Sequence, residues 1–139
     1  MQQNTNPTEL LLRKLLSEKV LFLDGAMGTM IQKYNLTEQD FRGERFKNHT
    51  NDLKGNNDIL VLTQPQIINE IQRKYLLAGA DILETCTFNA TCVSQSDYAL
   101  DDANFVYELN KTAAENLKKL CQEFTQQNPQ KPRFVAGVL

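Results

Sequence analysis

Two short polar segments, each following an apolar run, contain the side chains that could bind a small charged molecule. The first holds Asp24, Gly25, Ala26, Met27 and Gly28, and the second holds Glu84, Thr85, Thr87, Phe88 and Asn89. A carboxylate among apolar neighbours needs a cationic partner, because an unpaired buried charge is costly. The ammonium group of a substrate would provide such a partner for Asp24 and Glu84.

The first segment could also bind an anion. Its backbone amides lead into a predicted helix start, where free N–H groups and the helix dipole favour negative charge. An ammonium acceptor beside a carboxylate-binding turn is the combination that an α-amino acid needs. Two simpler interpretations stay open, since Asp24 could cap the following helix and Glu84 could pair with a residue of a neighbouring strand.

Three apolar runs predict β-strands, and the segments between them predict how the strands connect. The runs occupy residues 20–23, 80–88 and 133–139. The first is continuous rather than alternating, which is typical of a strand buried on both faces. Strand–helix–strand order favours crossover units and a parallel sheet. Ligands of such folds collect at the carboxyl ends of the strands, so we expect Asp24 and Glu84 to open onto the same rim.

Start and stop signals place the helices that connect these strands. Asn6 and Pro7 predict the start of a first helix, with leucines 11, 12, 15 and 16 on one face. A capping box at residues 63–66 predicts a second helix, which Gly79 ends in the left-handed conformation. A third helix is predicted over about residues 102–124. Apolar residues recur there every three to four positions, which predicts that one face of the helix packs in the core. One or two helical turns are expected over residues 29–34.

The connection over residues 35–57 is long and polar for a compact domain, and such loops are usually functional or a misread element. Within it, Arg42, Glu44 and Arg45 predict a surface charge cluster, and His49 predicts a solvated side chain. The apolar run 59–62 that follows fits no element firmly.

Composition excludes several classes of function. The chain has 139 residues, a net charge of -2 and no basic stripe, which argues against nucleic-acid binding. Neither a signal peptide nor an apolar run near the ~18 residues of a membrane span is present. No GxGxxG or Walker pattern suggests a nucleotide. The chain has an odd number of cysteines, namely Cys86, Cys92 and Cys121, and their spacing fits no common zinc-binding pattern. This predicts reduced thiols in a cytoplasmic protein.

Three parallel strands with one helix between each pair amount to part of an α/β structure. We therefore expect residues 1–18 to form a tail and helix, and residues 19–139 to form a partial barrel domain that stops at its third strand. The predicted fold class is α/β, namely the N-terminal part, about three βα units, of a (β/α)8 TIM barrel, which typically takes ~250 residues.

Five blocks in the same order resemble the homocysteine-binding domain of cobalamin-dependent methionine synthases. They are LFLDGAMGTMIQKY, DFRGERF, DLKGNNDILVLTQPQII, AGADILETCTFNAT and KPRFVAGVL. The resemblance implies a (β/α)8 barrel in which the two polar segments named above bind homocysteine. It also implies methyl transfer to homocysteine to form methionine. Cys86 stands where relatives carry Asn, and Ala26 where many carry Gly.

The same resemblance implies cofactors that this chain does not bind by itself, and it implies the partners of the chain. In the family, zinc is held by three cysteines of later strands, beyond Leu139, and methylcobalamin supplies the methyl group. None of Cys86, Cys92 and Cys121 matches those ligands, so no catalytic or metal-binding residue is expected within the chain. The expected partners are homocysteine, the remaining barrel strands, and the folate, cobalamin and activation modules of a parent enzyme.

Two other readings compete with a barrel fragment that is inactive alone. The chain could be a complete small α/β ligand-binding module, for example a flavodoxin-like one, without methyltransferase activity. It could also be a non-catalytic interaction protein that uses residues 35–57 as its contact surface.

Overall fold

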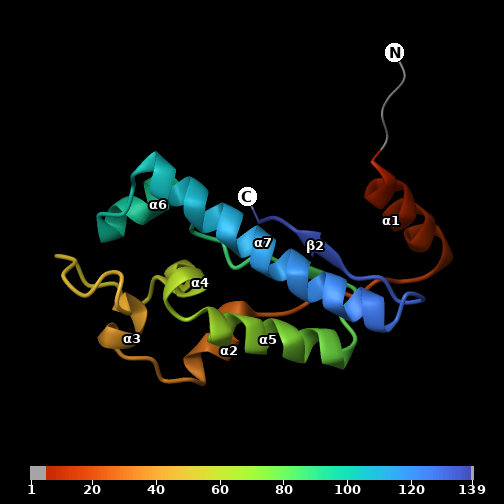
Figure 1. Ribbon diagram of the computed structural model, residues 1–139, viewed down its shortest axis with the longest axis horizontal. Helices are drawn as coiled ribbons and strands as arrows, with labels where there is room; N and C mark the ends of the chain where they lie inside the picture. The colour runs from red at the N-terminus through yellow and green to blue at the C-terminus, as the bar shows by residue number, and fades with distance from the viewer. Residues whose placement is uncertain (1–5, 139) are drawn as a thin grey trace, which may run out of the picture.

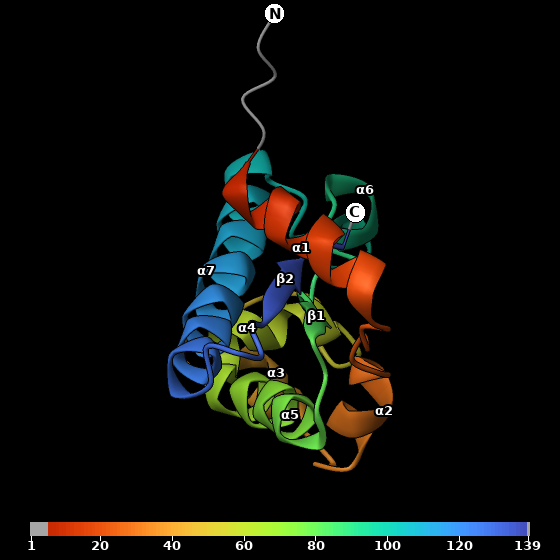
Figure 2. The same cartoon turned by 90° about the vertical axis from the view of Figure 1, so that its right-hand side faces the viewer.

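Three extended segments lie side by side in the order of the sequence, as crossover connections require. In the computed structural model, which describes residues 6–138, β1 (Ile82–Glu84) pairs in parallel with β2 (Phe134–Ala136). Leu23 forms a parallel bridge to Ile82. The Phe22 carbonyl accepts from the amides of Asp81 and Ile82, and the Ile82 carbonyl accepts from the Asp24 amide. On the other side, the Asp81 carbonyl accepts from Phe134 and the Thr85 amide donates to Ala136. The predicted parallel arrangement is therefore confirmed, with β1 in the middle (Figure 2).

The strands are shorter and more exposed than the sequence predicts. Residues 20–23 contribute a single bridge, and β1 and β2 each have three residues. Phe22 and Leu23 are 65% and 58% exposed, so the prediction of a strand buried on both faces is wrong for the described chain. The reason is that the described residues leave both faces of this segment open, since the consecutive side chains of Phe22 and Leu23 point to opposite faces. Asp81 helps to hold the segment in place, because its buried carboxylate accepts a hydrogen bond from the Phe22 amide.

Helices make up most of the described chain (Figure 1). The α-helices are α1 (Pro7–Glu18), α2 (Met27–Gln32), α3 (Glu38–Arg42), α4 (Leu60–Thr63), α5 (Pro65–Ala78), α6 (Cys92–Gln95) and α7 (Ala103–Gln127). Two short 3₁₀ helices, η1 (Asn57–Ile59) and η2 (Ser96–Tyr98), precede α4 and follow α6. The run 59–62, which fits no element by its sequence, thus belongs to η1 and α4.

The helix caps confirm most of the predicted boundaries. The Asn6 side chain accepts a hydrogen bond from Thr8, Asp102 caps α7, and Gly79 ends α5 with a φ of 109°. The predicted capping box before α5 is wrong. Gln64 is the N-cap and makes no side-chain cap hydrogen bond, because Thr63 already ends α4 and its hydroxyl bonds to a carbonyl of that helix's first turn.

The described chain has two buried apolar clusters. One lies between the strands and the pair α5 and α7, which run side by side on one face of the sheet (Figures 1 and 2). The larger one joins α2, α3, α4, α5 and the N-terminal half of α7. The α7 stripe is core as predicted, and its buried members include Leu109, Ala113, Leu117, Leu120 and Phe124. By contrast, α1 buries none of its residues, so its leucine face is not part of the core of residues 6–138.

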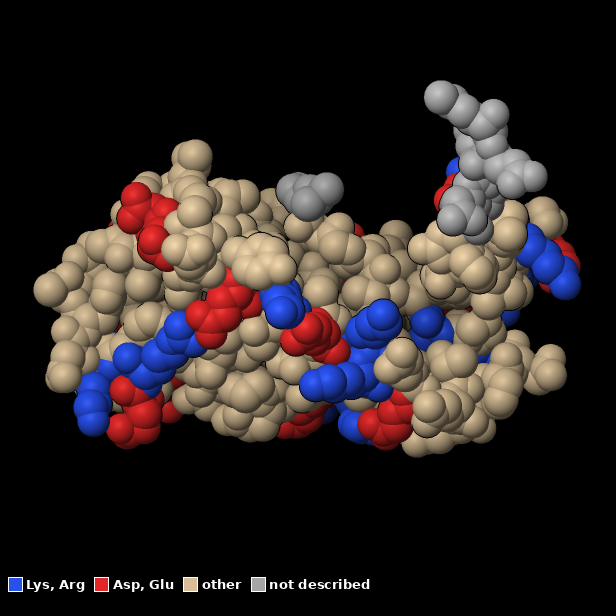
Figure 3. Space-filling model, turned by 45° about the horizontal axis from the view of Figure 1, so that its top comes forward, with Lys and Arg blue, Asp and Glu red and all other residues tan. Residues whose placement is uncertain are grey.

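Charges on the outside are paired rather than segregated. Nη1 of Arg45 lies 2.7 Å from Oε1 of Glu108, and Nη2 of Arg73 lies 2.9 Å from Oε2 of Glu123. On the face drawn in Figure 3, basic and acidic side chains are accordingly interleaved. No helix within residues 6–138 combines the length and the apolar composition needed to cross a membrane.

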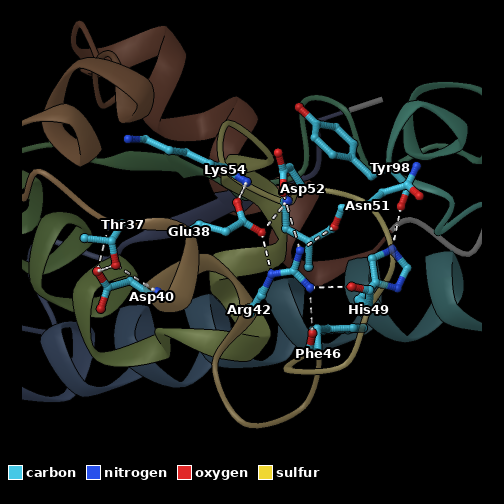
Figure 4. A network of polar contacts seen from close by, with 11 residues as sticks. Thr37, Glu38, Asp40, Arg42, Phe46, His49, Asn51, Asp52, Lys54 and Tyr98 are labelled. Carbon is cyan, nitrogen blue, oxygen red and sulfur yellow. Dashed lines mark hydrogen bonds and ion pairs between the residues drawn. The ribbon is translucent and has the colours of Figure 1, made fainter.

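Arg42 organises the polar connection instead of joining a solvated charge cluster, which corrects the sequence prediction (Figure 4). Its side chain is only 15% exposed, and its Nε lies 2.6 Å from a Glu38 carboxylate oxygen. Its terminal nitrogens donate to the carbonyls of His49, at 2.5 Å, and Asn51, at 2.9 Å. His49 is half-buried, with Nε2 2.7 Å from the Tyr98 carbonyl, so its predicted solvation is also wrong.

Replacing Arg42 with alanine is expected to lower the free energy of unfolding by about 2 kcal/mol, because several half-buried carbonyls lose their donor. Arg42→Lys should recover only part of the loss, since a lysine cannot reproduce the guanidinium fork. Lys47→Ala is the matched control, because the exposed Lys47–Glu44 pair should contribute little. Urea denaturation measures all three, and equal stability of Arg42→Ala and the parent protein would contradict this role.

Candidate functional site

All ten residues that the sequence predicts for the site line one cavity at the carboxyl ends of the strands. The cavity has a volume of about 480 Å³, which suits a small ligand. The predicted lining residues are Asp24, Gly25, Ala26, Met27, Gly28, Glu84, Thr85, Thr87, Phe88 and Asn89. The structure adds Asn57, Asp58, Cys86 and Val138. Sequence reasoning missed Asn57 and Asp58 because the short elements that carry them show no periodicity.

Asp24 directly follows the first extended segment, residues 20–23, and joins that segment to β1. Both of its carboxylate oxygens accept from the Glu84 amide, at 3.1 and 3.2 Å. The pKa of Asp24 is raised to about 6, chiefly by burial and also by the nearby Glu84 carboxylate, whereas the hydrogen bond from the Glu84 amide opposes the shift. The helix-cap interpretation is wrong, because Ala26 is the N-cap of α2.

Glu84 is exposed at the cavity, and within residues 6–138 its carboxylate has no ion-pair partner. The alternative in which it pairs with a neighbouring residue therefore finds no support in the described chain. Asp24, Asp58 and Glu84 all line the cavity, and no Lys, Arg or His does so among the described residues. The electrostatics of the cavity thus favour a cationic group.

The turn after Asp24 brings backbone close to α5. A Cβ added at Gly25 would lie 3.1 Å from the Tyr75 hydroxyl oxygen and 3.2 Å from a ring carbon, so glycine is the residue that fits without displacement. The helix α2 begins at Met27, and its first N–H groups have no partner within the helix. These amides lie on the cavity wall and can donate to an anion.

Thr85 and Thr87 line the cavity, but their hydroxyl groups bind the protein. The two oxygens lie 2.7 Å apart, Thr85 accepts from the Val138 amide, and Thr87 donates to the Val138 carbonyl. Both side chains are buried. They therefore fix the segment after β2, whereas the exposed Phe88 and Asn89 side chains remain available to a ligand.

The cysteines of the chain do not form a metal centre in the described residues. Cys86 and Cys121 are buried, Cys92 is exposed, and no cluster of three or more potential metal ligands occurs within residues 6–138. Burial raises the pKa of Cys121 to about 11 and that of Cys86 still further. A thiol held protonated is a poor zinc ligand, because the thiolate is the ligating form.

Comparison with known proteins identifies the family. The sequence model described as homocysteine S-methyltransferase matches residues 21–139. This chain belongs to the homocysteine S-methyltransferase family. The family assignment agrees with the resemblance of the five sequence blocks and covers both polar segments of the cavity.

Solved structures of the homocysteine methyltransferase MmuM from Escherichia coli are similar to this family member. The metallated form is 26% identical with a TM-score of 0.67, over 91% of this chain. The oxidized form is 27% identical with a TM-score of 0.69, over 96% of this chain. In both comparisons the chain spans 40% of the length of the MmuM chain.

Proposed function

We propose that this chain forms part of the homocysteine-binding site of a cobalamin-dependent methionine synthase, which transfers a methyl group to homocysteine to form methionine. The observation that carries the proposal is the cavity that Asp24 and Glu84 line together with the turn of residues 25–28. The ammonium group of homocysteine would bind the two carboxylates, and its carboxylate would bind the amides. Family membership supports the choice of homocysteine over other amino acids.

We also propose that the chain is the first part of a (β/α)8 barrel and is inactive alone. The parallel order of the three extended segments supports this, as does the exposure of Phe22 and Leu23 on the outer side of the first. In a barrel, a further strand and its neighbours would cover that side. The folate, cobalamin and activation modules would belong to the same parent enzyme.

Zinc and methylcobalamin are the cofactors that we propose for the parent enzyme, held by residues outside this chain. The described residues do not fit zinc, since no cluster of three or more potential ligands occurs within residues 6–138. The contribution of this chain is therefore to bind and orient homocysteine, so that its sulfur is held for attack on the methyl group.

Calorimetry with the full-length protein tests the binding mode. Two analogues of homocysteine each lack one charged group: 4-mercaptobutyrate has no ammonium, and 3-aminopropane-1-thiol has no carboxylate. Each should bind at least about tenfold more weakly than homocysteine, because a charge-assisted hydrogen bond is lost. Equal affinity for all three ligands would refute the proposed mode. Homocysteine binding without methyl transfer from methylcobalamin would favour the alternative of a ligand-binding module.

The close approach at Gly25 gives a separate prediction. Gly25→Ala should weaken homocysteine binding by roughly 3- to 10-fold, because the new Cβ must displace the turn or the Tyr75 ring and so misplace the amides. Gly137→Ala is the matched control, since an added Cβ there meets no atom within 4 Å. Titration calorimetry on both variants checks this, and identical affinities would show that the turn tolerates a side chain.

A further inference from the structure

The backbone of one residue at the cavity, Asn89, is held on both sides by buried side chains. A carboxylate oxygen of Asp58 accepts from the Asn89 amide at 2.6 Å. The Gln95 side chain donates to the Asn89 carbonyl at 3.0 Å. Asp58 is 3% exposed and Gln95 is fully buried. Both peptide groups that flank Asn89 are therefore fixed by residues far from it in sequence or in the next helix.

The two side chains that hold Asn89 are themselves anchored. Asn56 and Gln95 exchange a pair of hydrogen bonds between their amide groups, at 2.7 and 3.2 Å. The second carboxylate oxygen of Asp58 lies 3.8 Å from the Cys86 sulfur, whose S–H can donate to it. Asp58 thus contacts both ends of the turn 86–89, Cys86 at one end and Asn89 at the other. The polar groups in this contact all have hydrogen-bond partners.

The side chains that the turn presents to the cavity are free by comparison. Phe88 is 80% exposed, Asn89 is exposed, and both line the cavity. A turn with fixed backbone and exposed side chains is pre-organised, so that little ordering entropy is lost when a ligand binds.

We propose that Asp58 is a positioning residue of the homocysteine site, which fixes the turn 86–89 through its hydrogen bond to the Asn89 amide. This inference rests on the proposed function. It assigns Asp58 a role distinct from that of Asp24, because Asp58 is only 3% exposed and bonds to the turn 86–89, whereas Asp24 is half-buried and Glu84 exposed, so that both can reach the ammonium group. Burial raises the pKa of Asp58 to about 6, so an ionised carboxylate at this place is unfavourable for folding. Carboxylates with a strongly shifted pKa cluster at functional sites, which agrees with a role of Asp58 in the homocysteine site.

Homocysteine titration calorimetry on the full-length protein separates the relevant variants. Asp58→Ala removes the acceptor for the Asn89 amide and should raise the Kd for homocysteine at least about tenfold. Asp58→Asn keeps an acceptor oxygen of the same reach and should stay within about threefold of the parent protein. Asp101→Ala removes an exposed carboxylate elsewhere and should leave Kd unchanged.

The calorimetric stoichiometry distinguishes positioning from a purely structural role. If Asp58 only stabilised the fold, its loss would reduce the number of competent molecules while their Kd stayed at the parent value, and that result would overturn the proposal. If Asp58→Ala does not fold, hydrogen exchange on the parent protein decides: the Asn89 amide should be equally protected with and without homocysteine. Protection that arises only with ligand would overturn a pre-formed turn. Absence of any heat with the parent protein would refute the proposed function instead.

Discussion

Asp24→Ala is expected to weaken homocysteine binding by about 30- to 100-fold, the equivalent of roughly 2–3 kcal/mol. Asp24 is the carboxylate that joins the first extended segment to β1 at the cavity. Its removal leaves the ammonium group of the ligand without its principal partner. Glu84, which is more exposed, should matter less, and Glu84→Gln should cost several-fold. Titration calorimetry on the full-length protein measures both effects.

Two controls make this result specific to charge recognition. Asp24→Asn removes the charge but keeps an oxygen that can accept from the Glu84 amide. It therefore separates the effect of the charge on ligand binding from the effect of the hydrogen bond that joins Asp24 to β1. The analogue 4-mercaptobutyrate has no ammonium group, and its affinity should be nearly the same for Asp24→Asn and the parent protein. An equal loss of affinity for homocysteine and for this analogue would mean that Asp24 acts through the shape of the cavity.

Homocysteine affinity should rise about tenfold between pH 5 and pH 7 and then level off, because only ionised Asp24, whose pKa is raised to about 6, can pair with the ammonium group. Asp24→Asn should bind weakly but with little dependence on pH in this window. Asp58 has a pKa raised to about 6 as well, so Asp58→Asn is the necessary comparison. A pH dependence that survives in Asp24→Asn and disappears in Asp58→Asn would assign the titration to Asp58 and contradict the prediction.

The free energy of unfolding should fall as the pH rises toward 6, whereas the affinity for homocysteine should rise. Asp24 and Asp58 keep their protons in the folded state up to about pH 6 but lose them near pH 3.8 when unfolded. Their contribution to stability is therefore complete below about pH 4 and is lost as pH rises to about 6. The loss should be on the order of a few kcal/mol, because one pKa unit corresponds to about 1.4 kcal/mol, and most of it should come from buried Asp58, since solvent screening reduces the share of half-buried Asp24. Urea denaturation should show this fall in the parent protein and a flatter profile in the Asp24→Asn, Asp58→Asn double variant.

Carboxylates elsewhere do not obscure this window. Hydrogen bonds from backbone amides hold the pKa of Glu38 below its usual value, although burial opposes them, and an arginine partner lowers those of Glu108 and Glu123. Such groups stabilise the fold above their unfolded pKa, and that stability is lost as the pH falls below about 4.5. A fall in stability between pH 4.5 and pH 6 therefore reports on the two cavity carboxylates.

Local signals in the sequence determined the helices and the position of the cavity. Asn6, Gly79 and Asp102 act within a few residues of their own helix ends, so their effect is readable without knowledge of the fold. The period of α5 and α7 likewise lies in neighbouring turns. The alternation of strands with these helices then brings Asp24 and Glu84 to one rim, since parallel strands share their carboxyl edge.

Other features depended on contacts between distant residues. The run 59–62 is too short to show a period, so the placement of Asp58 at the cavity and its bond to Asn89, 31 positions away, could not be predicted. Arg42 resembles a surface arginine until the carbonyls of His49 and Asn51 fold around it. The apolar composition of residues 20–23 likewise indicated a strand, but burial depends on neighbours. Only the tertiary structure decided these points, because hydrogen bonds and burial between distant residues arise from packing and leave no local pattern.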